Sequence, residues 1–147
     1  IGELTNCLPQ AHQLLSQLSE QKEQLRPATK PVRVAYLIWH KPIMIAAGDT
    51  FINEMLGLCG FVNPLATRAG RYPQVTVGDL QGANLDAILL SSEPFRFGQR
   101  HINWYQERIE NVVVKVIDGE LFSWYGNRLL LALPYMQTLI NELTTCP

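Results

Sequence analysis

The chain has 147 residues, a formal net charge of -1, 47% hydrophobic residues and 17% charged residues. This size suits one domain that buries a core without disulfides, and the composition excludes a disordered chain. No polybasic tract occurs, which argues against nucleic acid or anionic membrane as a partner, and the longest apolar runs are far shorter than the roughly 20 residues of a membrane-spanning helix.

The first part of the chain predicts a long helix followed by a strand. Apolar residues recur at three- and four-residue steps over 5–25, which is the pattern of an amphipathic helix. Thr5 or Asn6 can cap its start. The run VRVAYLIW over 32–39 is β-branched and aromatic, and it predicts a buried strand.

Two shorter helices are expected next. Asp49 or Thr50 is placed to cap a helix over 51–60, which ends in a glycine. Thr76 can cap a short helix over 77–82, after a loop rich in Pro and Gly.

The rest of the chain continues the alternation. Strands are predicted over 86–92 and 112–117, with a helix near 99–109 between them and a final helix over 127–143 that Pro134 should kink. Each strand is an apolar block, which is typical of strands buried on both faces. The sequence therefore predicts an α/β fold: a three-layer α-β-α lobe with a mostly parallel sheet, preceded by a long helix.

Candidate binding residues lie in the loops that follow the predicted strands. In parallel sheets, ligands bind beyond the carboxyl ends of the strands. Aromatic side chains, Met and a few charges at that edge would form a rim that suits a large ligand or a partner protein. The candidates on this rim are Trp39, Lys41, Met44, Arg71, Tyr72, Glu93, Phe95, Phe97, Trp124, Tyr125 and Arg128.

The arginines near these loops differ in what they predict. Arginine binds carboxylates and phosphates well. Arg68 is better interpreted as a solvated charge, and for Arg71 both interpretations stay open. Arg128 falls in the first turn of the last helix, where the helix dipole disfavours a cation. The candidates for a compensating group are Asp118, Glu120, Glu93 and an anionic ligand.

Motifs of catalysis and of metal binding are absent from the sequence. No hydrolase, metalloprotease, P-loop or dinucleotide-binding motif occurs. His12, His40 and His101 show no metal-ligand spacing, and a solvated or capping role is the favoured interpretation. We therefore predict no catalytic residue, no metal and no cofactor. For Glu93, a structural or ligand-orienting role is favoured over proton transfer.

Three segments carry a resemblance to a known family. VRVAYLIWHKPIMIAAGDTFINEMLGLCGFVN, RYPQVTVGDLQGANLDAILLSSEPFRFGQRH and IDGELFSWYGNRLL resemble, in this order, the C-terminal lobe of ABC-importer substrate-binding proteins. The group is the helical-backbone kind, class III, which carries cobalamin, haem or iron-siderophore chelates. The segment IGELTNC and the helix after it resemble the helix that joins the two lobes in that family.

The resemblance implies a division of the chain and a ligand. Residues 1–30 would be the bridging helix and 31–147 the C-terminal ligand-binding lobe, with the first lobe upstream of Ile1. The ligand would be a metal chelate or a corrinoid, held against the rim residues named above. The location would be the periplasm or cell envelope, with the cytoplasm left open. An isolated lobe would expose its rim, so a dimer through the rim stays open.

One departure from the family concerns its permease partner. Relatives often carry a Glu, in the segment aligned with 73–80, that binds an arginine of the membrane permease. Gly78 stands at that position and Asp79 follows it. Either Asp79 substitutes, or docking on an ABC permease is altered. The alternatives to a solute receptor are a protein-interaction module and a small doubly wound enzyme domain that uses Glu93 with His40 or His101.

Overall fold

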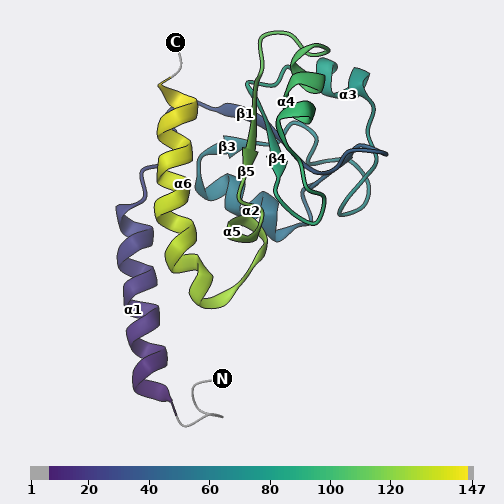
Figure 1. The fold of residues 1–147 in the computed structure, drawn as a ribbon. Coiled ribbons are helices and arrows are strands. Elements are labelled where there is room, and N and C mark those ends of the chain that lie inside the picture. Colours follow the sequence, from purple (N-terminus) through teal and green to yellow (C-terminus); the bar gives the residue numbers. More distant parts are fainter. Residues whose placement is uncertain (1–6, 146–147) are drawn as a thin grey trace.

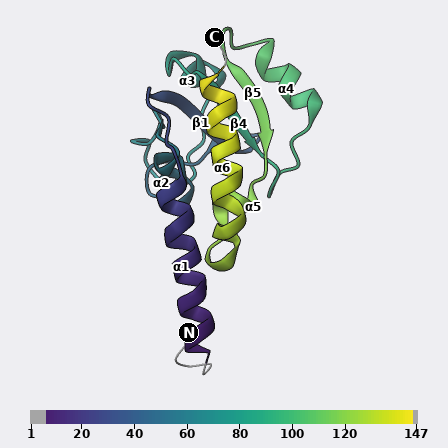
Figure 2. The same ribbon diagram turned by 90° about the vertical axis from the view of Figure 1, so that its left-hand side faces the viewer.

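The computed structural model describes residues 7–145. A central sheet has helices on both faces, and one long helix extends beyond the rest (Figures 1 and 2). Strand β1 pairs in parallel with β3 and β4, and β4 in parallel with β5, whereas β2 runs antiparallel to β1. The strands are β1 (Val32–Trp39), β2 (Met44–Ile45), β3 (Phe61–Val62), β4 (Ala87–Ser91) and β5 (Val113–Ile117), in the order β2-β1-β4-β5 with β3 beside β1.

The helices form the two outer layers. Those over one face of the sheet are α2 (Phe51–Leu58), α5 (Glu120–Ser123) and α6 (Leu129–Thr144), and those over the other face are α3 (Val77–Gly82) and α4 (Gln99–Gln106). The long helix α1 (Leu8–Gln24) lies outside α6 (Figure 2). The predicted three-layer α-β-α fold with a mostly parallel sheet and a preceding helix is confirmed.

The alternation of side chains along the strands explains the two cores. In β1, Val34 and Tyr36 join the core under α2 and α6, whereas Ala35 and Leu37 join the core under α3 and α4. All five residues of β4 are buried. A strand whose side chains meet apolar layers on both faces has no polar face, which is why each strand appears in the sequence as an apolar block.

Two predicted helix starts are confirmed by their caps. The Thr50 hydroxyl accepts a hydrogen bond from the Asn53 amide at 3.1 Å, so Thr50 rather than Asp49 caps α2. Thr76 caps α3, and Asp79 completes a capping box by accepting the Thr76 amide proton at 2.8 Å.

Some elements differ from the expectation. The two-residue strands β2 and β3 and the short helix α5 lie in segments predicted as loops, because they are too short to show a periodicity. A 3-10 turn at Gly126–Arg128 precedes α6, which runs through Pro134 without interruption. The predicted caps of the first helix, Thr5 and Asn6, lie outside the described residues.

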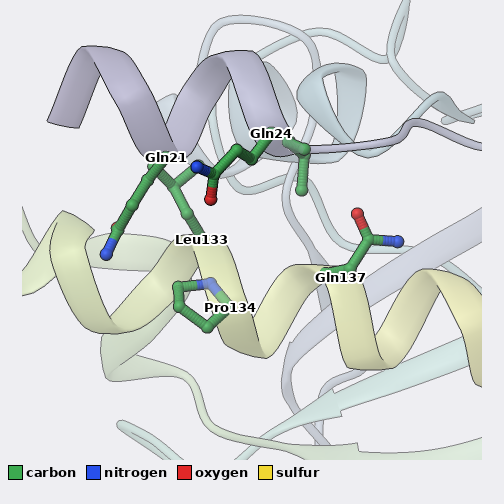
Figure 3. A pocket seen from close by; sticks show the side chains of 6 residues that line it. Gln21, Gln24, Leu133, Pro134 and Gln137 are labelled. Atoms are coloured by element: carbon green, nitrogen blue, oxygen red, sulfur yellow. The ribbon is translucent and has the colours of Figure 1, made fainter. Parts of the chain in front are cut away.

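Helix α1 is the least buried element. None of its residues, 8–24, is buried, and its amino-terminal half extends past the end of α6 (Figures 1 and 2). Its other half packs along α6, where side chains of both helices point into the space between them (Figure 3). The Arg26 amide donates to the Gln137 side chain at 2.7 Å across this seam. A cavity of about 230 Å³ in the seam is lined by Gln21, Gln24, Leu25, Leu133, Pro134 and Gln137.

Candidate ligand-binding site

The predicted candidates gather where β1, β4 and β5 end. The register pairs Leu37 with Leu90 and Ser91 with Ile117, so the three carboxyl ends meet at one edge of the sheet. The loops from these ends carry exposed or half-buried aromatic side chains. We call this group the aromatic rim, and its members are Trp39, Phe95, Trp124 and Tyr125.

One side of the aromatic rim is built on β1. Trp39 is 38% exposed, and its indole N–H donates to the carbonyl of Lys41 at 3.1 Å. The ring meets Phe95 edge to face with centroids 5.2 Å apart. Met44 lies opposite Trp39 in β2 and is half-buried. The hydrogen bond and the ring contact hold Trp39 while part of its surface stays accessible.

The other side is organised by a carboxylate. Glu93 Oε1 accepts hydrogen bonds from Trp124 Nε1 at 3.0 Å and from Ser123 Oγ at 3.2 Å. Trp124 is nevertheless 51% exposed. The hydrogen bond thus ties the polar edge of the indole and leaves much of the ring open. This geometry is compatible with the structural or ligand-orienting role predicted for Glu93.

Arg128 and Tyr125 complete this side. Arg128 forms an ion pair with Glu120, and its guanidinium lies 5.4 Å from the centroid of the Trp124 ring. Glu120 was one of the predicted compensating groups. Tyr125 is 68% exposed and rests on Phe51, with ring centroids 4.4 Å apart.

The loops can approach this closely because of Gly119. A Cβ atom on Gly119 would lie 2.1 Å from Ser91 Oγ and 3.0 Å from the Cγ of Glu93. The Gly119 amide also donates to Ser92 Oγ at 3.0 Å. The sequence did not indicate this residue, because a close approach between two loops leaves no local pattern.

A small cavity of about 230 Å³ opens between the two sides of the rim. Tyr72 lies at it and is 39% exposed, whereas Arg71 next to it donates from Nε to the carbonyl of Asp49 at 2.9 Å. Burial raises the pKa of Tyr36, whose hydroxyl therefore stays protonated and donates to Ser91 at 3.1 Å. The lining is Tyr36, Ile38, Ile52, Tyr72, Ser91, Glu93, Pro94 and Ser123.

Phe97 does not lie where the sequence analysis placed it. It was expected on the rim, but it is only 8% exposed and belongs to the core under α3 and α4. Its ring packs against Phe95 at 4.8 Å and against His101 at 5.4 Å. The first turn of α4 covers this segment, so Phe97 supports Phe95 rather than facing outward.

Beside the rim lies a second cavity, of about 440 Å³. His40 and His101 are both buried there, with ring centroids 4.9 Å apart. Burial is the largest cause that lowers the pKa of each, and nearby positive charge, from Arg100 in both cases, lowers it further. The sequence showed neither the pairing nor the burial of these residues. We call this cavity the histidine pocket, and its lining is His40, Lys41, Phe95, Arg100, His101 and Trp104.

Glu93 and the two histidines have different hydrogen-bond partners. Glu93 is bonded to Trp124 and Ser123, whereas His40 contacts the Tyr105 hydroxyl at 3.2 Å, and within residues 7–145 no hydrogen bond joins Glu93 to a histidine. In that same range, no three His, Cys, Asp or Glu side chains are grouped to hold a metal ion. No helix of the described chain is both long and apolar enough to cross a membrane.

The comparisons with known proteins agree with this fold. No protein-family model matches the chain. The vitamin B12-binding protein of Vibrio cholerae serotype O1 is 28% identical over 97 residues, which cover 66% of this chain and 35% of the relative. That of Pectobacterium atrosepticum is 24% identical over 136 residues, 92% of this chain and 48% of the relative. The curated relatives are named for binding, in agreement with the prediction that this is not an enzyme.

Solved structures of periplasmic binding proteins also match this fold. The periplasmic vitamin B12 binding protein of Vibrio cholerae matches with a TM-score of 0.70 and 23% identity, over 97% of this chain and 55% of that one. The periplasmic haem binding protein of the same organism matches with a TM-score of 0.77 and 19% identity, over 95% and 60%. The chain thus spans about half of these proteins. Its fold is that of one lobe of a class III periplasmic binding protein, as the resemblance implied.

Proposed function

We propose that this chain is the solute-binding lobe of an ABC-importer receptor in the periplasm or cell envelope. Its ligand would be a metal chelate or a corrinoid, such as cobalamin, haem or a ferric siderophore. The observation that carries the proposal is the aromatic rim, where Trp39, Trp124 and Tyr125 are exposed at the carboxyl edge of the sheet. The vitamin B12- and haem-binding relatives support it.

The chemistry of the rim suits a large, flat ligand. Exposed aromatic faces contribute much contact area at little cost in side-chain entropy. The indole N–H of Trp124 is already bonded to Glu93, and Arg128 is paired with Glu120. Because these polar groups are satisfied, the rim offers mainly apolar surface, to which a macrocycle can bind without leaving donors unpaired.

We also propose that residues 1–30 bridge to a first lobe and that 31–147 form the second. The exposed leucines of α1 support this. Leu8 is 42% exposed, Leu14 39% and Leu15 61%, on the half of the helix that extends past α6. Exposed apolar residues on one helix are suited to packing on another body. The ligand would then lie between the rim and that first lobe.

Asp79 is the residue that bears on docking to a permease. Asp79 is occupied by the α3 capping box and by an ion pair with Arg68. These contacts, with the Thr76 hydrogen bonds as the main cause, lower the pKa of Asp79 to about 2. We therefore propose that Asp79 does not replace the Glu of the relatives, and that any docking uses other groups.

A tryptophan-fluorescence titration of the two-lobed protein tests the function. The ligands would be cobalamin, cobinamide, haemin and several ferric siderophores, with correction for the inner-filter effect. We expect saturable quenching by one ligand class, weakened in Trp39→Phe and Trp124→Phe. Lys30→Gln is the control, because Lys30 is exposed and precedes β1, at the edge of the sheet opposite the aromatic rim.

Two results would count against the proposal. No saturable response to any ligand would favour the protein-interaction alternative. Equal weakening by Trp39→Phe, Trp124→Phe and Lys30→Gln would show that the effect is not specific to the rim. Sedimentation of the 147-residue chain alone would also establish whether an isolated lobe pairs.

A further inference from the structure

The histidine pocket has a composition that the proposed function does not explain. Its walls carry Lys41, Arg100 and two histidines, and among residues 7–145 no carboxylate lines it. We propose that this pocket binds an anionic group, a carboxylate or a phosphate, attached to an aromatic or macrocyclic body. The identity of that body rests on the proposed function, whereas the anion site stands on the geometry of the pocket alone.

His101 presents a hydrogen-bond donor to this pocket. The Gly98 amide donates to Nδ1 of His101 at 3.0 Å, so Nδ1 is an acceptor. In a neutral imidazole the proton must then be on Nε2. The Nε–H of Arg100 is aimed at this same Nε2, at 3.3 Å. A neutral imidazole accepts at only one of its nitrogens, so with Nδ1 as the acceptor the Nε–H of Arg100 faces a second donor. Two donors side by side need an acceptor between or in front of them.

His40 presents a second donor by a similar argument. Its Nδ1 is 3.2 Å from the hydroxyl of Tyr105, and in the described part of the chain this is the one partner of that buried hydroxyl. The hydroxyl is satisfied as a donor only if it donates to Nδ1, which leaves the proton of His40 on Nε2. Within residues 7–145, Nε2 of His40 has no hydrogen-bond partner, and His40 lines the pocket.

The charge of the pocket is also unbalanced. In the described range, neither Lys41 nor Arg100 takes part in an ion pair, whereas Arg68, Arg108, Lys115 and Arg128 each do. Burial lowers the pKa of both histidines, Arg100 lowers both further and Lys41 that of His40, so both are neutral donors at pH 7. Four donor groups with two positive charges fit one carboxylate or phosphate.

The pocket is connected to the aromatic rim through Phe95. The Phe95 ring contacts Trp39 at 5.2 Å and His101 at 5.2 Å, and Phe95 also lines the pocket. A ligand body on the rim could therefore extend an anionic arm past Phe95 to the four donors. Trp104 forms an aromatic wall of the pocket that can contact the arm.

The first experiment tests the anion site on the 147-residue chain without a macrocycle. The probes are 2-naphthoate, 2-naphthyl phosphate and the neutral 2-naphthamide, followed by ring 1H–15N NMR of the histidines. We expect both anions to shift the Nε2–H signals of His40 and His101, and 2-naphthamide to leave them unchanged. The double variant Lys41→Gln with Arg100→Gln should weaken anion binding by about ten-fold or more.

Lys30→Gln is the matched control, since Lys30 precedes β1 at the opposite edge of the sheet. Equal binding of 2-naphthamide, an Nε2 without a proton on His101, or equal weakening by Lys30→Gln would each overturn the proposal. Comparing the two anions assigns the site to carboxylate or phosphate.

The second experiment separates this inference from the proposed function. Haemin and its dimethyl ester have the same macrocycle, but only haemin carries free carboxylates. If haemin binds more tightly than its dimethyl ester, and the double variant removes this difference, both the proposed function and the anionic arm are supported. Equal binding of the two would uphold the rim and overturn the anionic arm. Binding of the naphthyl anions without either macrocycle would uphold the anion site and contradict the proposed function for this ligand.

Discussion

The aromatic rim and the histidine pocket share Phe95 but differ in how their charged groups are paired. On the rim, Glu120 pairs with Arg128, and Glu93 accepts from Trp124. In the pocket, Lys41 and Arg100 take part in no ion pair within residues 7–145. After burial, the charge of Arg100 contributes to the lowered pKa of both histidines, and that of Lys41 to the lowered pKa of His40. The polar groups of the rim have hydrogen-bond or ion-pair partners, whereas the pocket contains hydrogen-bond donors that lack an acceptor within residues 7–145.

The rings of the rim are also more exposed than the histidine rings of the pocket. Trp124 and Tyr125 present more than half of their surface, whereas His40 and His101 are buried. Affinity for a flat apolar body comes from exposed area, and selectivity for an anion comes from buried directional donors. One edge of the sheet can therefore provide both affinity for a flat body and selectivity for an anion if the exposed rings and the buried donors are kept apart.

The largest effect should come from Gly119→Ala. The added Cβ would clash with Ser91 Oγ and crowd Glu93, so the loops of the rim must separate. We expect a loss of about 3 kcal/mol in the free energy of unfolding. Chemical denaturation measures it. Gly82→Ala is the control, because nothing lies within 4 Å of its added Cβ, and its stability should be unchanged or slightly higher.

Gly119→Ala should also separate the two regions functionally. Ligand binding to the rim should weaken strongly, whereas 2-naphthoate should still shift His101 if the variant is folded. Loss of both signals in a folded variant would mean that the rim and the pocket depend on the same loop geometry.

A double-mutant cycle between Glu93 and Trp124 should give the next largest effect. Trp124→Phe keeps an aromatic ring but removes the indole donor, and Glu93→Ala removes the acceptor. A hydrogen bond to a carboxylate at a half-buried site predicts a coupling free energy of about 1 kcal/mol. Unfolding of the two single variants and the double variant measures it. A coupling near zero would mean that Glu93 does not orient the ring.

The fold and part of the rim could be predicted from the sequence for one physical reason. Strands buried on both faces are apolar blocks, and β1, β4 and β5 were visible as such. Once the strands are parallel, the side chains after their ends must meet at one edge. Trp39 and Trp124 were placed at this edge by this rule, although 84 residues lie between them in the sequence.

The histidine pocket could not be predicted, because it depends on how α4 lies over the second face. That packing buries Phe97 and brings His101 to His40, two residues that carry no shared motif. Gly119 was missed for a similar reason, since the contact it permits is with Ser91 at the end of β4, far from it in the sequence. Sequence patterns report the period of an element, and not the distance between two loops.

Acid should destabilise the protein through the histidine pocket. The pKa of His40 and of His101 is lowered in the folded state, mainly by burial. The unfolded chain therefore binds more protons below its ordinary histidine pKa of about 6.5, so stability is complete above that pH and falls as the pH is lowered. Denaturation at several pH values between about 7.5 and 5 measures this slope.

His101→Gln provides the matched variant for this prediction. Glutamine at this position can still accept the Gly98 amide proton, as in a capping box, but it does not titrate. The slope with pH should become shallower while the stability at pH 7.5 changes little. An unchanged slope would place the acid sensitivity elsewhere in the chain.

The smallest predicted effect is a change in the pKa of His101, and it tests whether the charges of the pocket and of the rim act separately. After burial, the Arg100 charge is the next cause that lowers the pKa of His101, so Arg100→Gln should raise that pKa. Arg128→Gln removes the same charge from the rim, where Glu120 already balances it, and should leave the pKa of His101 unchanged. NMR titration of the His101 ring measures both. Equal shifts would mean that the two regions share one electrostatic field, and a difference would show that an unpaired cation acts where a paired one does not.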